Sequence, residues 1–439
     1  MKPDFTKSKA FSERAEKLIP GGSHTYSRGR DRFPMESPNG ITHGKGSRVW
    51  DIDGNQFIDW SMGLTAVSLG HADPDVNAAV HEVIDQGVLF QRTSVVELDA
   101  ADCFLNAVGT DMVKFARHGS SVTTAAVKLA RAYTGRDLVA VPKEHPFFSF
   151  DDWFIGTTQS DFGVPEETKT YTKHFSYNDI DSVYELFQKY PDQIACIMLE
   201  PVKFDPPEDN FLAKLKNLCV QNGALLIFDE MVSGFKYAIP GASWMFDVQA
   251  DLYTFGKGIA NGYAAAALAG SGDVMRLGGI EREGDRKLFL LSTTHGGESV
   301  GLVAMMATMR RLSDGSVIKE NWRRGEALKA RLQRVIKTYG LQDHLSIVGY
   351  PCLMALIVKG PNGESQSQFS TLFMQEMIAN NVLFQGLFFM TPSHGEKECA
   401  ETEAAFEKAA SVFRAALDDG KTDGYLIGAA MKPVFRKFV

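Results

Sequence analysis

The spacing of hydrophobic residues changes along the chain. Apolar positions in residues 8–18 follow a helical spacing and stop before Pro20-Gly21-Gly22, which predicts a short amphipathic helix. Residues 48–60 resemble two short strands joined by a strong hairpin signal, Asp53-Gly54. From about residue 110, short continuous apolar segments alternate with helical patterns. Such segments are typical of strands buried on both faces of a mainly parallel sheet.

These patterns predict an α/β fold with two domains. The buried strands are expected at 112–115, 138–141, 195–199 and 224–228, and helices between them at 123–134 and 211–222. After about residue 300 the pattern predicts a long helical stretch, strands near 345–358 and 381–390, and a closing helix near 399–418. We therefore expect a layered large domain over 51–300 and a smaller α+β domain over 301–439, which the N-terminal segment 1–50 joins.

Composition narrows the class of protein. The 439 residues are 44% hydrophobic and 23% charged, as in ordinary globular proteins. A net charge of -8 without a basic stripe gives no support for nucleic-acid binding. Five scattered cysteines predict reduced thiols and neither a disulfide framework nor a metal site. The polar N-terminus lacks a signal-peptide core, and the longest small-apolar stretch, 263–270, is too short to span a bilayer. A cytoplasmic protein without a membrane segment is expected.

Three features suggest one bound cofactor. Gly119-Ser120-Ser121 stands where a helix begins, so backbone N–H groups and the helix dipole offer a site for a phosphate, although an ordinary helix cap gives the same pattern. The segment GALLIFDE (223–230) predicts a buried strand that ends in Asp229 and Glu230, where ligands bind in open α/β sheets. Lys257 lies between two glycines after a further short strand, and lysine amines form Schiff bases with carbonyl groups. A strand-end acid is more often a cap, and a lone lysine more often a solvated loop residue. Together they provide partners for the phosphate, ring nitrogen and aldehyde of pyridoxal 5′-phosphate (PLP).

The sequence resembles the class III aminotransferases of fold type I, in the branch that contains glutamate-1-semialdehyde 2,1-aminomutase. Coverage of most of the chain makes the resemblance specific for fold and cofactor and less so for substrate. The matching segments are IPGGSHTYSR (19–28), SRVWDIDGNQFIDW (47–60), LGHADPDV (69–76), KLARAYTGRD (128–137), HFSYNDIDSV (174–183), LEPV (199–202), GALLIFDEMVSGF (223–235), DLYTFGK (251–257) and STTHGGES (292–299).

The resemblance implies a large, mainly parallel sheet of the seven-stranded type and roles for individual residues. Lys257 matches the lysine that binds PLP as a Schiff base, and Asp229 matches the partner of the pyridine nitrogen. Gly119 and Ser120 match the phosphate-binding turn. Thr294 matches a threonine that reaches the neighbouring subunit's cofactor phosphate, which implies a homodimer with shared sites.

Further positions match less closely. Arg28 falls where this branch has an arginine that binds a substrate carboxylate, and a surface arginine is an equal alternative. Met231 occupies the position of the apolar residue that packs on one face of the cofactor ring. Where the family has Tyr-His-Gly, this chain has EHPFFSF (144–150). Phe147 is the predicted stacking ring, with Phe148 and His145 as competitors.

The departures from the family concern the substrate side. They fall in the phosphate turn 117–121, in the aromatic segment 144–150, and in GIANGYAAAALAG (258–270), which replaces a Gly-Gly-Gly-Leu-Pro turn. The segment 155–173, a gating loop in the aminomutase, is diverged and polar, which suits a mobile lid. These differences indicate a substrate other than glutamate semialdehyde.

The function expected from the sequence is PLP-dependent transamination. Glutamate is the expected amino donor, and the acceptor is the aldehyde or ketone of a small hydroxylated carboxylate, such as a sugar acid of the 8-oxo-3,8-dideoxy-octulosonate type used in lipopolysaccharide biosynthesis. The alternatives are the intramolecular aminomutase, an isomerase, and a non-catalytic protein with the same fold.

Overall fold

The computed structural model describes residues 3–280 and 286–434. The chain forms two compact units. The large unit comprises Thr65–Ser68 and Pro74–Ile318, whereas the small unit comprises the residues up to Leu64, Leu69–Asp73 and the residues from Lys319. Within the described residues the chain passes between the units in α2 (Met62–Thr65), after Ser68, after Asp73 and in α12 (Ser316–Thr338).

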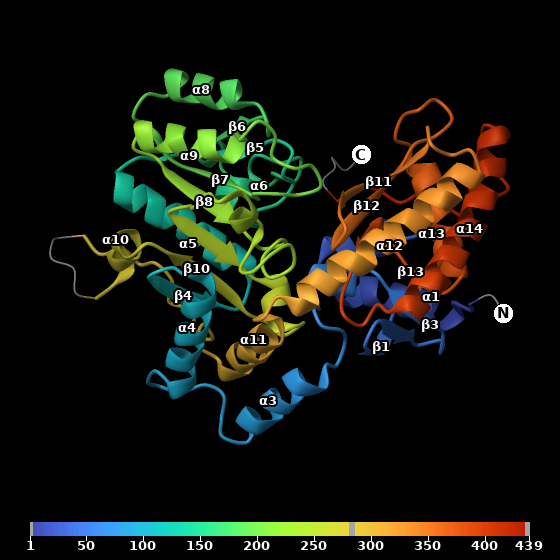
Figure 1. The fold of residues 1–439 in the computed structure, drawn as a ribbon, viewed down its shortest axis with the longest axis horizontal. Helices are drawn as coiled ribbons and strands as arrows, with labels where there is room; N and C mark the ends of the chain where they lie inside the picture. Colours follow the sequence, from blue (N-terminus) through green and yellow to red (C-terminus); the bar gives the residue numbers. More distant parts are fainter. Residues whose placement is uncertain (1–2, 281–285, 435–439) are drawn as a thin grey trace. The chain divides into compact units, whose positions relative to one another are not determined.

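The large unit is built on a seven-stranded sheet with the order β4-β10-β9-β8-β7-β5-β6 (Figure 1). Strand β10 is antiparallel to both of its neighbours, and the other neighbouring strands are parallel. The mainly parallel sheet expected from the sequence is therefore confirmed. Its strands are β4 (Met112–Ala116), β5 (Leu138–Pro142), β6 (Thr172–Phe175), β7 (Ile194–Leu199), β8 (Leu225–Asp229), β9 (Leu252–Phe255) and β10 (Ala266–Gly270).

Helices cover this sheet on both faces. In Figure 1, α8 and α9 lie on one side of β7 and β8, and α5 lies on the other side. Helix α5 ends at Gly135, whose φ of 68° is the left-handed conformation of a helix C-cap. The helices of this unit are α3 (Pro74–Ile84), α4 (Val95–Val108), α5 (Gly119–Thr134), α6 (Asp152–Ile155), α7 (Glu166–Lys169), α8 (Ile180–Lys189), α9 (Phe211–Gln221), α10 (Gly272–Met275) and α11 (Ser299–Leu312).

The predicted strands and helices of the large unit are confirmed to within a few residues, and α5 begins four residues before the predicted start of 123. Strands β6 and β10 were missed. Strand β6 is only four residues long and its first three residues, Thr-Lys-His, are polar, whereas β10 consists of Ala, Leu and Gly, which have little β propensity. Strand β10 is nevertheless completely buried, because it lies between β4 and β9.

The small unit contains two sheets. A four-stranded sheet has the order β1-β2-β3-β13, and a three-stranded sheet has the order β11-β12-β14. The predicted hairpin is confirmed by β2 and β3, which pair in antiparallel fashion. The strands are β1 (Ile41–Lys45), β2 (Arg48–Asp51), β3 (Gln56–Asp59), β11 (Leu345–Tyr350), β12 (Leu353–Val358), β13 (Val382–Leu383) and β14 (Leu387–Phe389), and the helices besides α12 are α1 (Thr6–Leu18), α13 (Ser367–Ala379) and α14 (Glu396–Asp418).

The hairpin turn also caps the N-terminus of α1. The Asp53 carboxylate accepts hydrogen bonds from the backbone N–H groups of Lys7 at 2.7 Å and Ser8 at 2.8 Å. Helix α1 has no side-chain cap from its own N-cap residue, Phe5, so Asp53 satisfies donors that the helix leaves open. A residue 46 positions away in sequence from Lys7 thus fixes where the helix begins.

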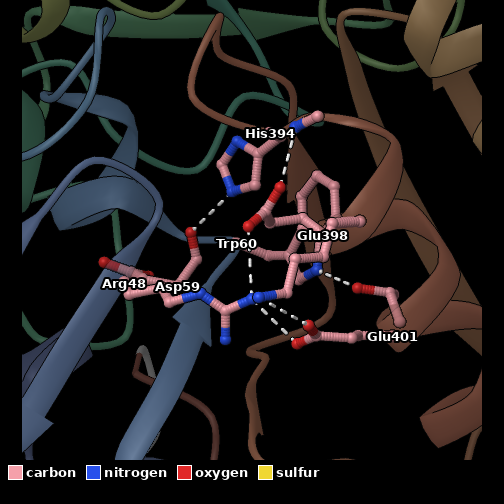
Figure 2. Close-up of polar contacts among 9 residues, drawn as sticks. Arg48, Asp59, Trp60, His394, Glu398 and Glu401 are labelled. Carbon is pink, nitrogen blue, oxygen red and sulfur yellow. Dashed lines mark hydrogen bonds and ion pairs between the residues drawn. The ribbon is translucent and has the colours of Figure 1, made fainter.

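A partly buried polar cluster joins the β2–β3 hairpin to α14 (Figure 2). Arg48 forms ion pairs with Glu398 at 3.2 Å and Glu401 at 2.8 Å. The His394 ring stacks on Trp60 with centroids 4.1 Å apart, and its Nε2 donates to the Asp59 backbone oxygen at 3.1 Å while Nδ1 accepts a backbone N–H. Burial lowers the pKa of His394 to about 4, so this ring is neutral at pH 7.

Candidate functional site

Three neighbouring strands of the large unit end in charged residues. Glu200 directly follows β7, Asp229 ends β8, and Lys257 comes two residues after β9. Leu199 pairs with Phe228 and Asp229 pairs with Thr254, so the parallel ladder brings these strand ends to the same edge of the sheet. Carboxyl ends of parallel strands are where open α/β sheets bind ligands.

Asp229 is a buried carboxylate with capacity for one more donor. Its Oδ1 accepts hydrogen bonds from Thr254 Oγ1 at 2.9 Å and from the Met231 backbone N–H at 3.0 Å. Both hydrogen bonds that Asp229 accepts within the described residues end on Oδ1. Burial, and next the nearby Glu200 charge, raise the pKa of Asp229 to about 7. A protonated ring nitrogen at Oδ2 would supply the missing donor and favour the ionised carboxylate.

Lys257 stands in a constrained backbone position. Its φ of 47° is left-handed, and it begins the short 3₁₀ turn that follows β9. Burial lowers the pKa of Lys257, while the charges of Glu200 and Asp229 act in the opposite direction. A lowered pKa increases the neutral fraction of the amine, which is the form that attacks a carbonyl.

The phosphate turn predicted at Gly119 and Ser120 is the first turn of α5. A side chain at Gly119 would place Cβ 3.0 Å from Met231 Sδ, so the close packing favours glycine. Ser120 is buried, and its Oγ accepts a hydrogen bond from the Phe150 backbone N–H at 3.2 Å. The N-terminus of α5 therefore lies against Met231 in the segment that follows β8. A phosphate bound by the backbone N–H groups of this helix end would lie near Asp229.

Met231 connects the phosphate turn to the lysine. A Cβ on Gly256 would lie 2.3 Å from Met231 Sδ, and a Cβ on Gly119 would lie 3.0 Å from the same sulfur. The buried thioether thus packs between the residue before Lys257 and the start of α5. This arrangement places Met231 at the predicted site.

The aromatic candidates lie in different surroundings. Phe147 is 46% exposed and contacts Phe154 edge-on, with ring centroids 6.0 Å apart. Phe148 belongs to the buried core of the large unit. His145 is buried, and its Nδ1 accepts a hydrogen bond from the Glu200 backbone N–H at 3.1 Å. Among the three, His145 has the hydrogen bond to the strand end beside Asp229.

His145 is held in its neutral form. Burial, together with the Lys203 charge, lowers the pKa of His145 to about 3. Because Nδ1 is the acceptor for Glu200, the ring proton resides on Nε2.

The remaining predicted residues lie on exposed surface. Thr294 is exposed in a turn in which the Gly296 N–H bonds to the Thr293 carbonyl at 3.1 Å. Arg28 is exposed and belongs to the small unit. The segment predicted to be a lid contains α7 and an ion pair in which Lys169 contacts Asp161 at 2.8 Å and Glu166 at 2.6 Å.

Sequence reasoning missed the roles of Glu200, Thr254 and Glu230. Thr254 supports Asp229 from the next strand, a contact that only strand pairing reveals. Glu230 is completely buried and accepts hydrogen bonds from the backbone and side chain of Ser243 and from the Ala242 N–H. Glu230 therefore anchors the loop after β8, whereas the adjacent Asp229 faces the candidate site. The signal available in the sequence was the position of Glu200 and Glu230 at the ends of buried apolar strands.

Among the described residues, no helix combines the length and apolar character needed to cross a membrane.

Comparison with known proteins identifies the family. The profile of class-III aminotransferases matches residues 33–354. Glutamate-1-semialdehyde 2,1-aminomutase of Caldicellulosiruptor saccharolyticus is 28% identical, with 92% of this chain and 98% of the relative covered. Glutamate-1-semialdehyde 2,1-aminomutase 2 of Bacillus thuringiensis (strain Al Hakam) is 31% identical, with 94% and 99% covered.

Solved structures share the fold. The FumI protein of Sphingopyxis sp. MTA144, solved in a PLP form, has a TM-score of 0.85 at 24% identity, with 96% of this chain and all of that chain covered. A transaminase with PLP bound has a TM-score of 0.86 at 24% identity over 95% of this chain and all of that one. The profile match and the site geometry agree. This chain belongs to the class-III aminotransferases and is a PLP-dependent enzyme.

Proposed function

We propose that the chain is a transaminase that takes an amino group from an amino acid, with glutamate as the donor. The acceptor is the aldehyde or ketone of a small hydroxylated carboxylate, such as a sugar acid of the 8-oxo-3,8-dideoxy-octulosonate type. The observation that supports amino-group chemistry most directly is that buried Asp229 and Lys257, whose pKa is lowered, stand at adjacent strand ends, close enough for each charge to act on the other.

The described residues fit PLP. Asp229 Oδ2 is available for the ring nitrogen, the start of α5 at Gly119 and Ser120 for the phosphate, and the Lys257 amine for the aldehyde. When bound, PLP supplies an electron sink for the carbon that loses or gains a proton. Thr254 keeps the Asp229 carboxylate oriented through its 2.9 Å hydrogen bond.

Lys257 moves the proton. Once its Nζ is free, the neutral amine accepts a proton from the substrate carbon and returns it as an ammonium, as a general base and then a general acid. Burial lowers the pKa of Lys257, which increases the neutral fraction of the amine relative to an exposed lysine. Met231 restricts the volume behind Gly256 and so limits where the Lys257 backbone can lie.

The test is a half-reaction with L-glutamate. Wild-type protein loaded with PLP is expected to release 2-oxoglutarate and to lose the absorbance of the lysine-bound cofactor. Lys257→Ala should abolish both signals, whereas Lys214→Ala, at an exposed position of α9, should preserve them. A Lys257→Ala protein that still turns over would refute the assignment.

The second candidate is the intramolecular aminomutase. It is favoured by the names of relatives that match over nearly their whole length, including the enzyme of C. saccharolyticus. A mutase would convert glutamate 1-semialdehyde to 5-aminolevulinate and release little 2-oxoglutarate from glutamate. Supplying each substrate to the same preparation separates the two activities.

We also propose a homodimer with shared sites, in which Thr294 contacts the cofactor phosphate of the neighbouring subunit. Its exposed turn suits such a contact. Mixing Lys257→Ala with Thr294→Ala subunits tests this directly. If Thr294 acts across the interface, a mixed dimer has one site with both defects and one intact site, so activity reappears. If each site is built from one chain, both sites of the mixed dimer remain defective.

A further inference from the structure

Lys203 introduces a positive charge that none of the roles above uses. It lies three residues after Glu200, in the loop that follows β7. Its Nζ is 3.8 Å from Glu200 Oε1, and the two side chains are 27% and 7% exposed, respectively. The ammonium is therefore partly open to solvent, while the carboxylate beside it is buried.

The position of this ion pair follows from the sheet. Since Leu199 pairs with Phe228, the next residues along the two strands, Glu200 and Asp229, are neighbours at the same edge. Glu200 is close enough to Asp229 and Lys257 for its charge to raise the pKa of both. The Lys203–Glu200 pair thus borders the site on the β7 side.

The backbone of Lys203 is fixed in place. Its carbonyl oxygen accepts a hydrogen bond from the hydroxyl of Tyr237 at 2.9 Å, and Tyr237 is buried. Tyr237 belongs to the loop after β8, so two strand-end loops are joined at this point. A fixed backbone reduces the conformational entropy that the lysine loses when it binds a ligand.

The ammonium retains donors for a ligand. A lysine has three N–H donors, and 3.8 Å to Glu200 is an ion pair that is longer than a hydrogen bond. The Lys203 charge also lowers the pKa values of Lys257 and His145, so its field extends to both residues. An oxyanion near Nζ would form a charge-assisted hydrogen bond, which is stronger than a neutral one.

The cofactor phosphate has its own site elsewhere. The phosphate turn begins α5, which follows β4, and a Cβ on Gly119 in this turn would lie 3.0 Å from Met231 Sδ. Lys203 belongs to a different segment, the loop after β7, whose backbone is tied to Tyr237. Since the phosphate turn is assigned to the start of α5, a ligand group at Lys203 is assigned to the substrate.

We infer that Lys203 binds a carboxylate of the substrate, and that Glu200 holds its ammonium at the edge of the site until the substrate arrives. This inference rests on the proposed function, since it assumes a substrate at Lys257. It differs from the role implied for Arg28, because Lys203 belongs to the same unit as Lys257.

The experiment is a titration of PLP-loaded protein with glutarate, a dicarboxylate without an amino group, followed by the absorbance of the bound cofactor. Lys203→Gln should weaken glutarate binding about tenfold, the loss expected for one charge-assisted hydrogen bond of about 1.4 kcal/mol. Lys203→Arg should restore most of the affinity, and Lys214→Gln should leave it unchanged. Glutaramide, which is uncharged, should not distinguish these proteins.

A second variant guards against a folding defect. Glu200→Gln removes the competing acid and should tighten glutarate binding, the opposite direction to Lys203→Gln. The inference is overturned if wild type shows no saturable glutarate binding, or if Lys203→Gln binds as tightly as wild type. Failure of the proposed function is a separate result, because it appears as absent 2-oxoglutarate release from glutamate in wild type, whatever glutarate does.

Discussion

The buried carboxylate of Asp229 makes the cofactor-free protein less stable as pH rises, and Asp229→Asn should remove this effect. Burial first, and then the Glu200 charge, raise the pKa from its ordinary 3.8 to about 7. Below pH 3.8 the carboxyl is protonated in the folded and unfolded protein alike, so ionisation costs nothing. The cost grows as pH rises from 3.8 to about 7 and is complete above that.

The magnitude follows from the pKa values. A tenfold change in proton affinity is worth about 1.4 kcal/mol, so a rise from 3.8 to about 7 corresponds to about 4 kcal/mol. An asparagine oxygen can accept the same hydrogen bonds from Thr254 and Met231 that Asp229 Oδ1 accepts now. Its new amide N–H group needs a partner, which lowers the expected gain to about 2–3 kcal/mol.

The assay is urea unfolding of the cofactor-free proteins between about pH 5 and pH 8. Asp229→Asn should exceed wild type in free energy of unfolding at pH 8, and the difference should shrink toward pH 5. Thr254→Val is the matched comparison, because it removes a donor that stabilises the ionised form and should destabilise the protein most at high pH. Adding PLP should stabilise wild type more than Asp229→Asn. An Asp229→Asn protein that is no more stable than wild type at pH 8, or a difference independent of pH, would refute this reasoning.

Three further substitutions probe packing and charge. Gly256→Ala places a methyl group 2.3 Å from Met231 Sδ and should lower the free energy of unfolding by about 1–3 kcal/mol. Adding Met231→Ala to the same chain should partly restore this loss, and a double-mutant cycle that shows no coupling would contradict the contact. Burial lowers the pKa of His394 to about 4, so as pH decreases the unfolded chain binds a proton at this residue before the folded protein does. The free energy of unfolding should therefore fall by up to about 3 kcal/mol between pH 6.5 and pH 4. His394→Gln should flatten this pH dependence in urea unfolding, and an unchanged pH dependence would argue against a buried neutral ring. Arg48→Met leaves Glu398 without its cation and should lower the free energy of unfolding by about 1–2 kcal/mol at low salt, whereas equal stability would show that the ion pairs contribute nothing.

The sequence by itself determined the layered fold and the order of the site. Continuous apolar segments predicted β5, β7 and β8, because a strand that is buried on both faces carries apolar residues at every position. The helix start at Gly119, the strand-end Asp229 and the glycine-flanked Lys257 were recognisable because each depends on local backbone geometry.

Tertiary structure alone decided which side chains support these residues. The hydrogen bond from Thr254 to Asp229, the contact of Met231 with Gly256 and the hydrogen bond from Tyr237 to the Lys203 carbonyl join residues on different strands or loops. The different roles of the adjacent acids Asp229 and Glu230 are also visible only in the structure, since Glu230 anchors a loop and Asp229 faces the site. Sequence spacing reports what one segment does, whereas burial and charge at a site arise from strands brought together by the sheet, and these set the pKa values on which the chemistry depends.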